Sequence, residues 1–304
     1  MLMKLVDVYL RLRRAAGSQL HRAEAHLRRF AHFATQRGDH YIKTATVIDW
    51  IIAETSSQDE RILRLSEIIR LALFAKAEDA RHQIPPHGIF GRRTPRRPPF
   101  IYSEDDIRRL VQAAAYLGPV GSLRSLTFKT LFALLAVTGL RISEALALRF
   151  NDLTADGLLI RDSKFHKSRW VPLHESTLHA LQQYIEHRKA VAGADSHLFV
   201  SPSGGPLRRG AVYRVFRQLL KRIGLDCGSV PRRPRIHDLR HSFAVRALQL
   251  CPEGRAHVGR HTLALSTYLG HKDVSSTYWY LQATPQLMRD IAVACEEAFQ
   301  GGSS

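Results

Sequence analysis

The first 85 residues place apolar side chains at the spacing of helix faces, at i, i+3, i+4 and i+7. The three clearest segments are 5–17, 20–38 and 59–83. Gly17 and Gly38 end two of them, where a helix C-cap favours glycine because the backbone turns left-handed there. Arginines occupy the opposite faces. We therefore predict a helical domain over residues 1–85.

The helical pattern stops at a proline-rich segment. Residues 84–100, IPPHGIFGRRTPRRPPF, hold five prolines and four arginines and show no apolar period. Proline fixes φ and removes a backbone donor, so neither a helix nor an inner strand is expected here. We predict a basic linker over residues 86–100.

Residues 101–304 predict a second domain that is mainly helical. Ser103 is a candidate N-cap because acidic residues fill the turn that follows it, and an apolar helix is expected to end at Gly139. The stretch 156–174 alternates around a polar turn at about 163–168 and predicts a β-hairpin. Further helices are expected at about 175–191, 207–223, 237–250, 261–270 and 285–299. The predicted fold class is mainly α with a small β-hairpin sheet (α+β).

The composition is that of a folded and strongly basic chain. The 304 residues include 45 Lys and Arg against 27 Asp and Glu, a formal charge of +18, and 45% are hydrophobic. This apolar content excludes a disordered chain, and the charge favours a polyanionic partner, most often nucleic acid. A ribosome-like basic surface or a face for anionic lipid is the alternative. On the nucleic-acid interpretation, the arginines expected along DNA phosphates are Arg92, Arg93, Arg96, Arg97, Arg232, Arg233 and Arg235.

The cysteines and the apolar runs argue against a secreted or membrane-spanning protein. Cys227, Cys251 and Cys295 are scattered and form no CxxC pair, which indicates a reducing compartment. Asp7 and Arg11 interrupt the apolar start of the chain, unlike a signal peptide. The run LFALLAV is far shorter than the ~20 residues that span a bilayer. We expect a cytoplasmic, nucleoid-associated protein.

Two segments carry basic residues where contacts with a phosphate group are common. Arg141, in TGLRISE, follows a helix-ending glycine at the start of the next predicted helix, near backbone donors. Lys164 and Lys167 lie at the tip of the predicted hairpin, where an ammonium on a turn can protonate a leaving oxygen. Each feature alone is more often an ordinary surface residue.

The segment RIHDLRHSF places three reactive side chains on one helix. His237 lies three residues before Arg240 and four before His241, so it shares a face with each. His237 and Arg240 can contact one phosphate; alternatively, His237 and His241 can ligate a metal in the manner of HExxH. Asp238 stands where that motif needs glutamate, and no clear third ligand follows at its spacing. We therefore interpret His241 as a helix-packing residue.

The last motif is LGHKDVSSTYWYL. His271 follows a glycine turn, and Tyr280 lies nine residues further on. A tyrosine hydroxyl can attack phosphorus and form a phosphotyrosyl ester. Tyr278 and Tyr280 are about 200° apart on a helix, so only one of them can face a given pocket. The alternative for either is a core aromatic beside Trp279.

These four motifs, in this order, resemble the catalytic set of the tyrosine recombinase (phage integrase) family. The resemblance covers residues from about 101 to 290, and the helical N-terminal part looks like the family's core-binding domain. The catalytic residues it implies are Arg141, Lys164, His237, Arg240, His271 and Tyr280, with Glu144 supporting Arg141. Tyr278 stays a minor alternative, because TYWYL departs from the family's usual sequence. A second departure is the extra segment 251–265, in which His257 and His261 are interpreted as surface or DNA-facing side chains.

The resemblance implies DNA strand exchange without metal, cofactor or ATP. Two arginines and His271 hold the phosphate while Tyr280 forms a 3′-phosphotyrosyl bond. His237 serves as the base and Lys164 as the acid. The expected partners are double-stranded DNA and further protomers, either identical copies in a tetramer or a sister recombinase. The predicted helix at 285–299 either docks on a neighbouring protomer or packs on its own core.

The sequence therefore predicts a site-specific recombinase, the integrase or transposase of a mobile element. Two alternatives stay open. A DNA-binding regulator with the same fold would have no need of Tyr280. A type IB topoisomerase-like enzyme would share the chemistry but act on any supercoiled DNA.

Overall fold

The structure is a computed structural model of the 304-residue chain. It describes residues 1–18, 20–94, 98–163, 167–191, 196–226, 233–250 and 255–270. The chain divides into two compact units, unit 1 (Met1–Arg97) and unit 2 (Pro98–Ser304). Each unit is built around its own apolar core.

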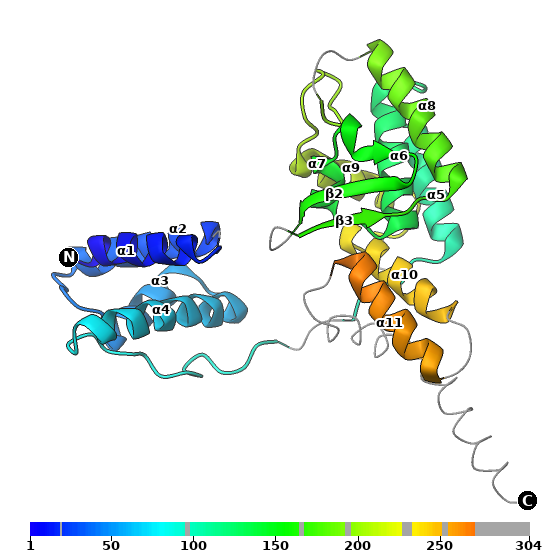
Figure 1. Ribbon diagram of the computed structural model, residues 1–304. Coiled ribbons are helices and arrows are strands. Elements are labelled where there is room, and N and C mark those ends of the chain that lie inside the picture. Colours follow the sequence, from blue (N-terminus) through cyan, green and yellow to red (C-terminus); the bar gives the residue numbers. More distant parts are fainter. Residues whose placement is uncertain are drawn as a thin grey trace, which may run out of the picture. The chain divides into compact units, whose positions relative to one another are not determined.

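Unit 1 is helical throughout its regular part (Figure 1). Its helices are α1 (Leu2–Ala15), α2 (His21–Gln36), α3 (Thr44–Glu54) and α4 (Gln58–Glu78). Gly17 and Gly38 take the predicted left-handed backbone, with φ of 81° and 75°. Helix α3 was not among the three periodic segments, because its Thr, Val and Ile residues weaken a helix signal. Burial decides its conformation, since Trp50 and Ile51 lie in the core, where the Trp50 ring meets Phe30 edge-on.

The first part of the expected linker lies against unit 1. Gln58 Nε2 donates hydrogen bonds to the carbonyls of Phe90 and Arg92, at 3.1 Å each. The backbone N–H of Thr94 donates to Asp59 Oδ1 at 2.9 Å. Residues up to Thr94 are therefore attached to the first turn of α4, although they form neither helix nor strand.

Most of the described residues of unit 2 lie in helices (Figure 1). They are α5 (Glu104–Ala115), α6 (Leu123–Thr138), α7 (Ile142–Ala147), α8 (Glu175–Val191), α9 (Arg209–Arg222), α10 (Ile236–Gln249) and α11 (Arg255–Leu269). Ser103 caps α5 as predicted: its Oγ accepts from the N–H of Asp106 at 3.0 Å, and Asp106 Oδ2 accepts from the N–H of Ser103. Gly139 ends α6 with a φ of 61°, also as predicted.

A small antiparallel sheet accompanies these helices and confirms the predicted hairpin. Its strands are β1 (Leu153–Thr154), β2 (Gly157–Ser163) and β3 (Lys167–Val171), in the order β1-β2-β3, and the 3-10 helix η1 (Phe150–Asp152) leads into it. Leu158, Ile160 and Val171 face the core, whereas Trp170 is 52% exposed. The fold class is therefore mainly α with a small sheet, as predicted.

Helix α11 begins earlier than the sequence pattern indicated. It starts at Arg255, six residues before the expected start at residue 261, so much of segment 251–265 is helical. His261 is half-buried, with its Nε2 2.6 Å from the carbonyl oxygen of Ala247 on α10. It is thus a partly exposed side chain that packs against α10, and not one that stands free at the surface, because α10 and α11 pack together at this point. The His257 side chain and the predicted helix at 285–299 lie outside the described residues.

No helix in the described part of the chain combines the length and apolar character that crossing a membrane requires.

Candidate active site

Arg141 lies at the N-terminus of α7, two residues after Gly139 ends α6. A Cβ on Gly139 would lie 2.5 Å from the ring of Phe243, so glycine allows the end of α6 to approach α10 closely. The N–H of Arg141 donates to Glu144 Oε2 at 2.9 Å, and its Nη1 donates to Oε1 at 2.7 Å. Glu144 therefore fixes both the backbone and the side chain of Arg141.

Arg240 reaches the same place from α10. A hydrogen bond attaches this helix to the first residues of unit 2: the N–H of Tyr102 donates to Ser242 Oγ on α10 at 2.8 Å. The Arg240 side chain is buried, with 2% of its residue surface exposed. Its Nη1 donates to the carbonyl of Gly139 at 2.8 Å and its Nη2 to that of Leu269 at 2.5 Å. Two backbone carbonyls thus fix the direction of the guanidinium.

Both arginines meet at the C-terminal end of α11. The carbonyl of Leu269 accepts from Arg141 Nη1 at 3.4 Å as well as from Arg240. The carbonyl of Gly270 accepts from Arg141 Nη2 at 3.1 Å. The last carbonyls of a helix lack intrahelical donors and carry partial negative charge, so guanidinium groups are favourable there. The next residue in the sequence is His271.

Arg169 on β3 joins this group, although it was not among the residues predicted from the sequence. Its Nη1 and Nη2 donate to the two carboxylate oxygens of Glu144, at 3.1 and 2.9 Å. Its Nε donates to the carbonyl of Tyr268 at 2.7 Å. The alternation of side chains along a strand could have indicated that Arg169 points inward. Arg169 shares a strand face with buried Val171, and the exposed Trp170 lies between them in the sequence. We call Arg141, Glu144, Arg169 and Arg240 the arginine cluster.

Glu144 is the buried anion of the arginine cluster. Burial alone would raise the pKa of its carboxyl group. The hydrogen bonds and charge of Arg169, followed by the backbone and side-chain hydrogen bonds of Arg141, outweigh the burial and hold the pKa of Glu144 below its ordinary value. The carboxylate is therefore ionised at neutral pH. The cluster then combines three guanidinium cations with one carboxylate, which leaves it positively charged.

His237 and His241 lie in the first two turns of α10. His237 is exposed and lies three residues before Arg240. Its ring meets the buried ring of His241 edge-on, with centroids 4.7 Å apart. This agrees with the interpretation of His241 as a helix-packing residue. Asp238 is also buried, where it accepts from the N–H of Arg235 at 2.8 Å and so caps α10.

Several predicted residues lie outside the described part of the chain. They are Lys164, His271, Tyr280 and the alternative Tyr278, and the DNA-contacting candidates Arg96, Arg97 and Arg232. Of the predicted catalytic set, the structure brings Arg141, Glu144 and Arg240 together and places His237 one turn from Arg240.

The other arginines expected along DNA are exposed. Arg92 and Arg93 lie in the segment attached to α4. Arg233 forms two hydrogen bonds with Asp226, at 2.9 and 3.0 Å, and lowers the pKa of that carboxyl group. Arg235 bonds Asp238 through its Nη2 at 3.0 Å. The guanidinium groups of Arg233 and Arg235 are more than half exposed, whereas the carboxylates that they pair with are buried.

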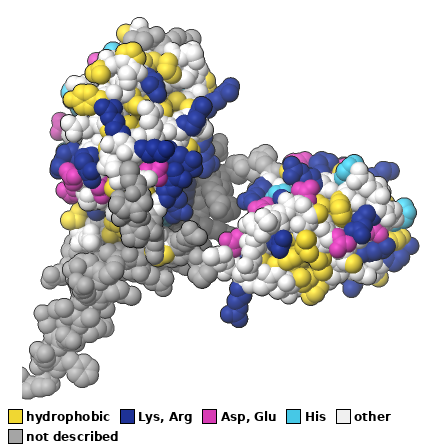
Figure 2. Space-filling view, turned by 180° about the vertical axis from the view of Figure 1, so that it is seen from behind, with side chains coloured by type: hydrophobic (Ala, Val, Ile, Leu, Met, Phe, Trp, Pro, Cys, Tyr) yellow, Lys and Arg dark blue, Asp and Glu magenta, His cyan; other side chains and the backbone are white. Residues whose placement is uncertain are grey.

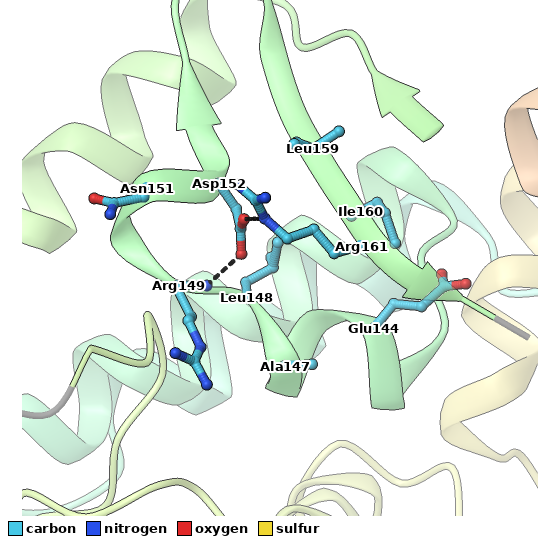
Figure 3. A pocket seen from close by; sticks show the side chains of 9 residues that line it. All are labelled: Glu144, Ala147, Leu148, Arg149, Asn151, Asp152, Leu159, Ile160 and Arg161. Carbon is cyan, nitrogen blue, oxygen red and sulfur yellow. Dashed lines mark hydrogen bonds and ion pairs between the residues drawn. The ribbon is translucent and has the colours of Figure 1, made fainter. Parts of the chain in front are cut away.

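A hollow of about 530 Å³ lies beside Glu144 (Figure 3). Residues of α7, η1 and β2 line it. Asp152 joins its walls by accepting from the N–H of Arg149 at 2.9 Å and from Arg161 Nε at 2.5 Å. Figure 3 shows the Arg161 side chain reaching Asp152 and that of Arg149 pointing away from it. This ion pair ties η1 to β2, and Glu144 is the one lining residue that also belongs to the arginine cluster.

Comparison with known proteins identifies the class. The model of the phage integrase family matches residues 101–286. The protein y4rB of Sinorhizobium fredii, which is assigned as an integrase/recombinase, is 37% identical over 305 residues and covers 97% of each chain. This chain therefore belongs to the phage integrase family, the tyrosine recombinases, and is an enzyme that breaks and rejoins DNA strands.

Solved structures share the fold. The Tn1549 transposon integrase in complex with circular intermediate DNA has a TM-score of 0.67 at 18% identity, with 96% of this chain and 99% of that chain covered. A lambda integrase tetramer bound to a Holliday junction has a TM-score of 0.62 at 19% identity, with 91% and 76% covered. The predicted helical architecture with a small sheet is thus the architecture of these recombinases.

Proposed function

We propose that this recombinase is the integrase of a mobile element and exchanges duplex DNA strands through a 3′-phosphotyrosyl intermediate. The observation that carries the proposal is the convergence of Arg141 from α7 and Arg240 from α10 on the end of α11, one residue before His271. Two neighbouring guanidinium groups with fixed directions suit a phosphodiester, because its non-bridging oxygens accept charge-assisted hydrogen bonds.

In the proposed reaction one phosphate ester replaces another. The hydroxyl oxygen of Tyr280 attacks phosphorus, the new P–O bond forms, and the bond to O5′ breaks. His237 takes the tyrosine proton, and Lys164 gives a proton to the leaving O5′. The 5′-hydroxyl of a second strand then attacks the phosphotyrosine and releases Tyr280. Because the number of phosphate esters does not change, the reaction needs no ATP.

The charge of the arginine cluster supports these roles. Negative charge grows on the non-bridging oxygens as the pentacoordinate phosphorane forms, and preorganised cations stabilise it. The Arg141 side chain is 25% exposed, so a phosphate can approach it from solvent. We assign the clamp on the phosphate to Arg141, Arg240 and His271.

Duplex DNA is the proposed substrate of both units. The chain carries a formal charge of +18, and Figure 2 shows Lys and Arg side chains gathered on the face of unit 2 that it presents. We assign unit 1 as the core-binding domain and unit 2 as the catalytic domain. The lambda integrase tetramer on a Holliday junction supports assembly of several protomers, and y4rB and the Tn1549 integrase support the mobile-element role. Such an enzyme acts in the cytoplasm, on nucleoid DNA.

A covalent-trap assay tests the proposal. The substrate is a nicked duplex built from the DNA that borders the element carrying this gene, so that cleavage releases a short strand and cannot reverse. The reaction is run in EDTA with the wild type, Tyr280→Phe and Tyr278→Phe. We expect a denaturant-resistant protein–DNA adduct with the wild type and Tyr278→Phe, and none with Tyr280→Phe.

The other outcomes separate the alternatives. An adduct lost in Tyr278→Phe instead moves the nucleophile by two residues within the same chemistry. Tight binding of the correct site without any adduct contradicts cleavage and favours a DNA-binding regulator. Relaxation of any supercoiled plasmid, without site preference, favours a type IB topoisomerase-like activity.

A further inference from the structure

Arg169 is the one arginine of the arginine cluster to which the reaction above assigns no role. We propose that Arg169 is a positioning residue for strand cleavage. Arg169 fixes the position of the Glu144 carboxylate, and Glu144 in turn fixes the guanidinium of Arg141. Arg169 also anchors the end of α11, after which His271 follows in the sequence. This inference rests on the proposed function and adds a residue to it.

The guanidinium of Arg169 donates to three acceptors. Nη1 and Nη2 of Arg169 face the two oxygens of Glu144 side by side, at 3.1 and 2.9 Å. Its Nε donates to the carbonyl of Tyr268 at 2.7 Å. Only 11% of the side chain is exposed, so its direction is set by these acceptors. A lysine ammonium is a point charge without this planar fork and cannot reproduce the geometry.

Glu144 in turn constrains Arg141. Each carboxylate oxygen is shared: Oε1 accepts from Arg141 Nη1 and Arg169 Nη1, and Oε2 accepts from the N–H of Arg141 and from Arg169 Nη2. Without Arg169 the carboxylate would keep its burial but lose half of its donors. It could then rotate or take up a proton, and either change would release the Arg141 side chain.

Arg169 also contacts the C-terminal end of α11. Gly270 has a left-handed φ of +66°, and a Cβ built on it would lie 3.0 Å from Arg169 Nη1 and 3.1 Å from Cζ. The guanidinium therefore lies directly against the Gly270 backbone. Arg169 lies on β3, the second strand of the hairpin, and Lys164 lies between the two hairpin strands in the sequence. Arg169 thus connects this strand with α7 and with the residue before His271.

The test compares single-turnover adduct formation, on the nicked duplex at saturating protein, in Arg169→Gln, Arg169→Lys and a matched control. The control is Arg109→Gln, because Arg109 also bonds carboxylates, Asp105 and Asp106, and one carbonyl, that of Ile223. We expect Arg169→Gln to slow adduct formation about 100-fold through misplacement of the reacting groups. Arg169→Lys should recover only part of the rate, and Arg109→Gln should stay within about twofold of the wild type.

A pH profile separates positioning from a general structural defect. Among the described residues, Arg141 and Arg169 are the charged groups that face Glu144. Loss of Arg169 raises the pKa of Glu144, so the rate of Arg169→Gln should fall as the pH is lowered, where the wild type still holds an ionised carboxylate. A purely structural defect would lower the rate by the same factor at each pH.

A double-mutant cycle completes the test. If Arg169 acts through Glu144, then Arg169→Gln should cost much less in a Glu144→Gln background than in the wild type. The inference is wrong if Arg169→Gln matches Arg109→Gln in rate and pH profile. If Arg169→Gln fails to fold by circular dichroism, a wild-type rate and pH profile in Arg169→Lys overturn the inference. Absence of any adduct with the wild type would instead overturn the proposed function.

Discussion

At the scale of single residues, the site depends on the acceptors available to guanidinium groups. A guanidinium does not lose its proton in proteins, so the fold can adjust its direction but not its charge. The Glu144 carboxylate accepts hydrogen bonds from Arg141 and Arg169 and so orients both guanidinium groups. Backbone carbonyls at the end of α11 accept further hydrogen bonds from these two arginines and from Arg240. The carbonyl groups at a helix end have fixed positions because they belong to the backbone. Side chains that donate hydrogen bonds to them are therefore also fixed in position.

Gly270→Ala tests the fit between Arg169 and this backbone. The left-handed φ of Gly270 disfavours a side chain, and the added Cβ would press on the Arg169 guanidinium. We expect the free energy of unfolding to fall by about 1–2 kcal/mol, and adduct formation to slow because Arg169 must shift. Urea unfolding and the covalent trap measure the two effects. Gly205→Ala is the control, since a Cβ there meets nothing within 4 Å; unchanged stability and rate in Gly270→Ala would contradict the fit.

At the scale of elements, packing between helices determined the secondary structure of a segment whose sequence gave only a weak helix signal. Segment 251–265 contains Pro252 and Gly259, which lower its helix propensity. Helix α11 nevertheless starts at Arg255, and its Leu265 and Leu269 pack in a cluster with apolar residues of α10. This packing also brings the end of α11 to the arginines.

Capping is the element-scale interaction that the sequence predicted best, and it can be measured in one pair of variants. Ser103 and Ser57 both occupy N-cap positions with extended backbone, but only Ser103 accepts a hydrogen bond through its side chain. We expect Ser103→Ala to lower the free energy of unfolding by about 1 kcal/mol and Ser57→Ala by a few tenths. Urea denaturation of the full chain gives both values, and equal losses would contradict this account of the cap.

At the scale of the whole molecule, the excess of positive charge is the dominant property. A formal charge of +18 on 304 residues attracts a polyanion along its length rather than at one point. Neutralising about 6–10 phosphates releases their counterions, which makes the affinity fall steeply with salt.

Salt dependence gives the corresponding prediction. In fluorescence anisotropy, the logarithm of the DNA association constant should fall against the logarithm of salt concentration with a slope of about −5 to −9. Replacing both Arg92 and Arg93 by Gln should reduce the slope by about 2 at most, equally on specific and non-specific duplexes. An unchanged slope would mean that these two arginines do not lie on phosphates.

The sequence alone determined the features that act over a few residues. The caps at Ser103 and Gly139, the hairpin, and the three-residue spacing of His237 and Arg240 all follow from local backbone geometry, and the order of the motifs identified the family. Only the tertiary structure showed that Arg169 bonds Glu144, 25 positions away, and that Arg141 bonds the carbonyl of Gly270, 129 positions away. The physical reason is that the tertiary fold brings these groups together: a backbone carbonyl is the same in each residue type, and a carboxylate has no mark of its distant partner, so a sequence carries no sign of which acceptor a guanidinium will meet.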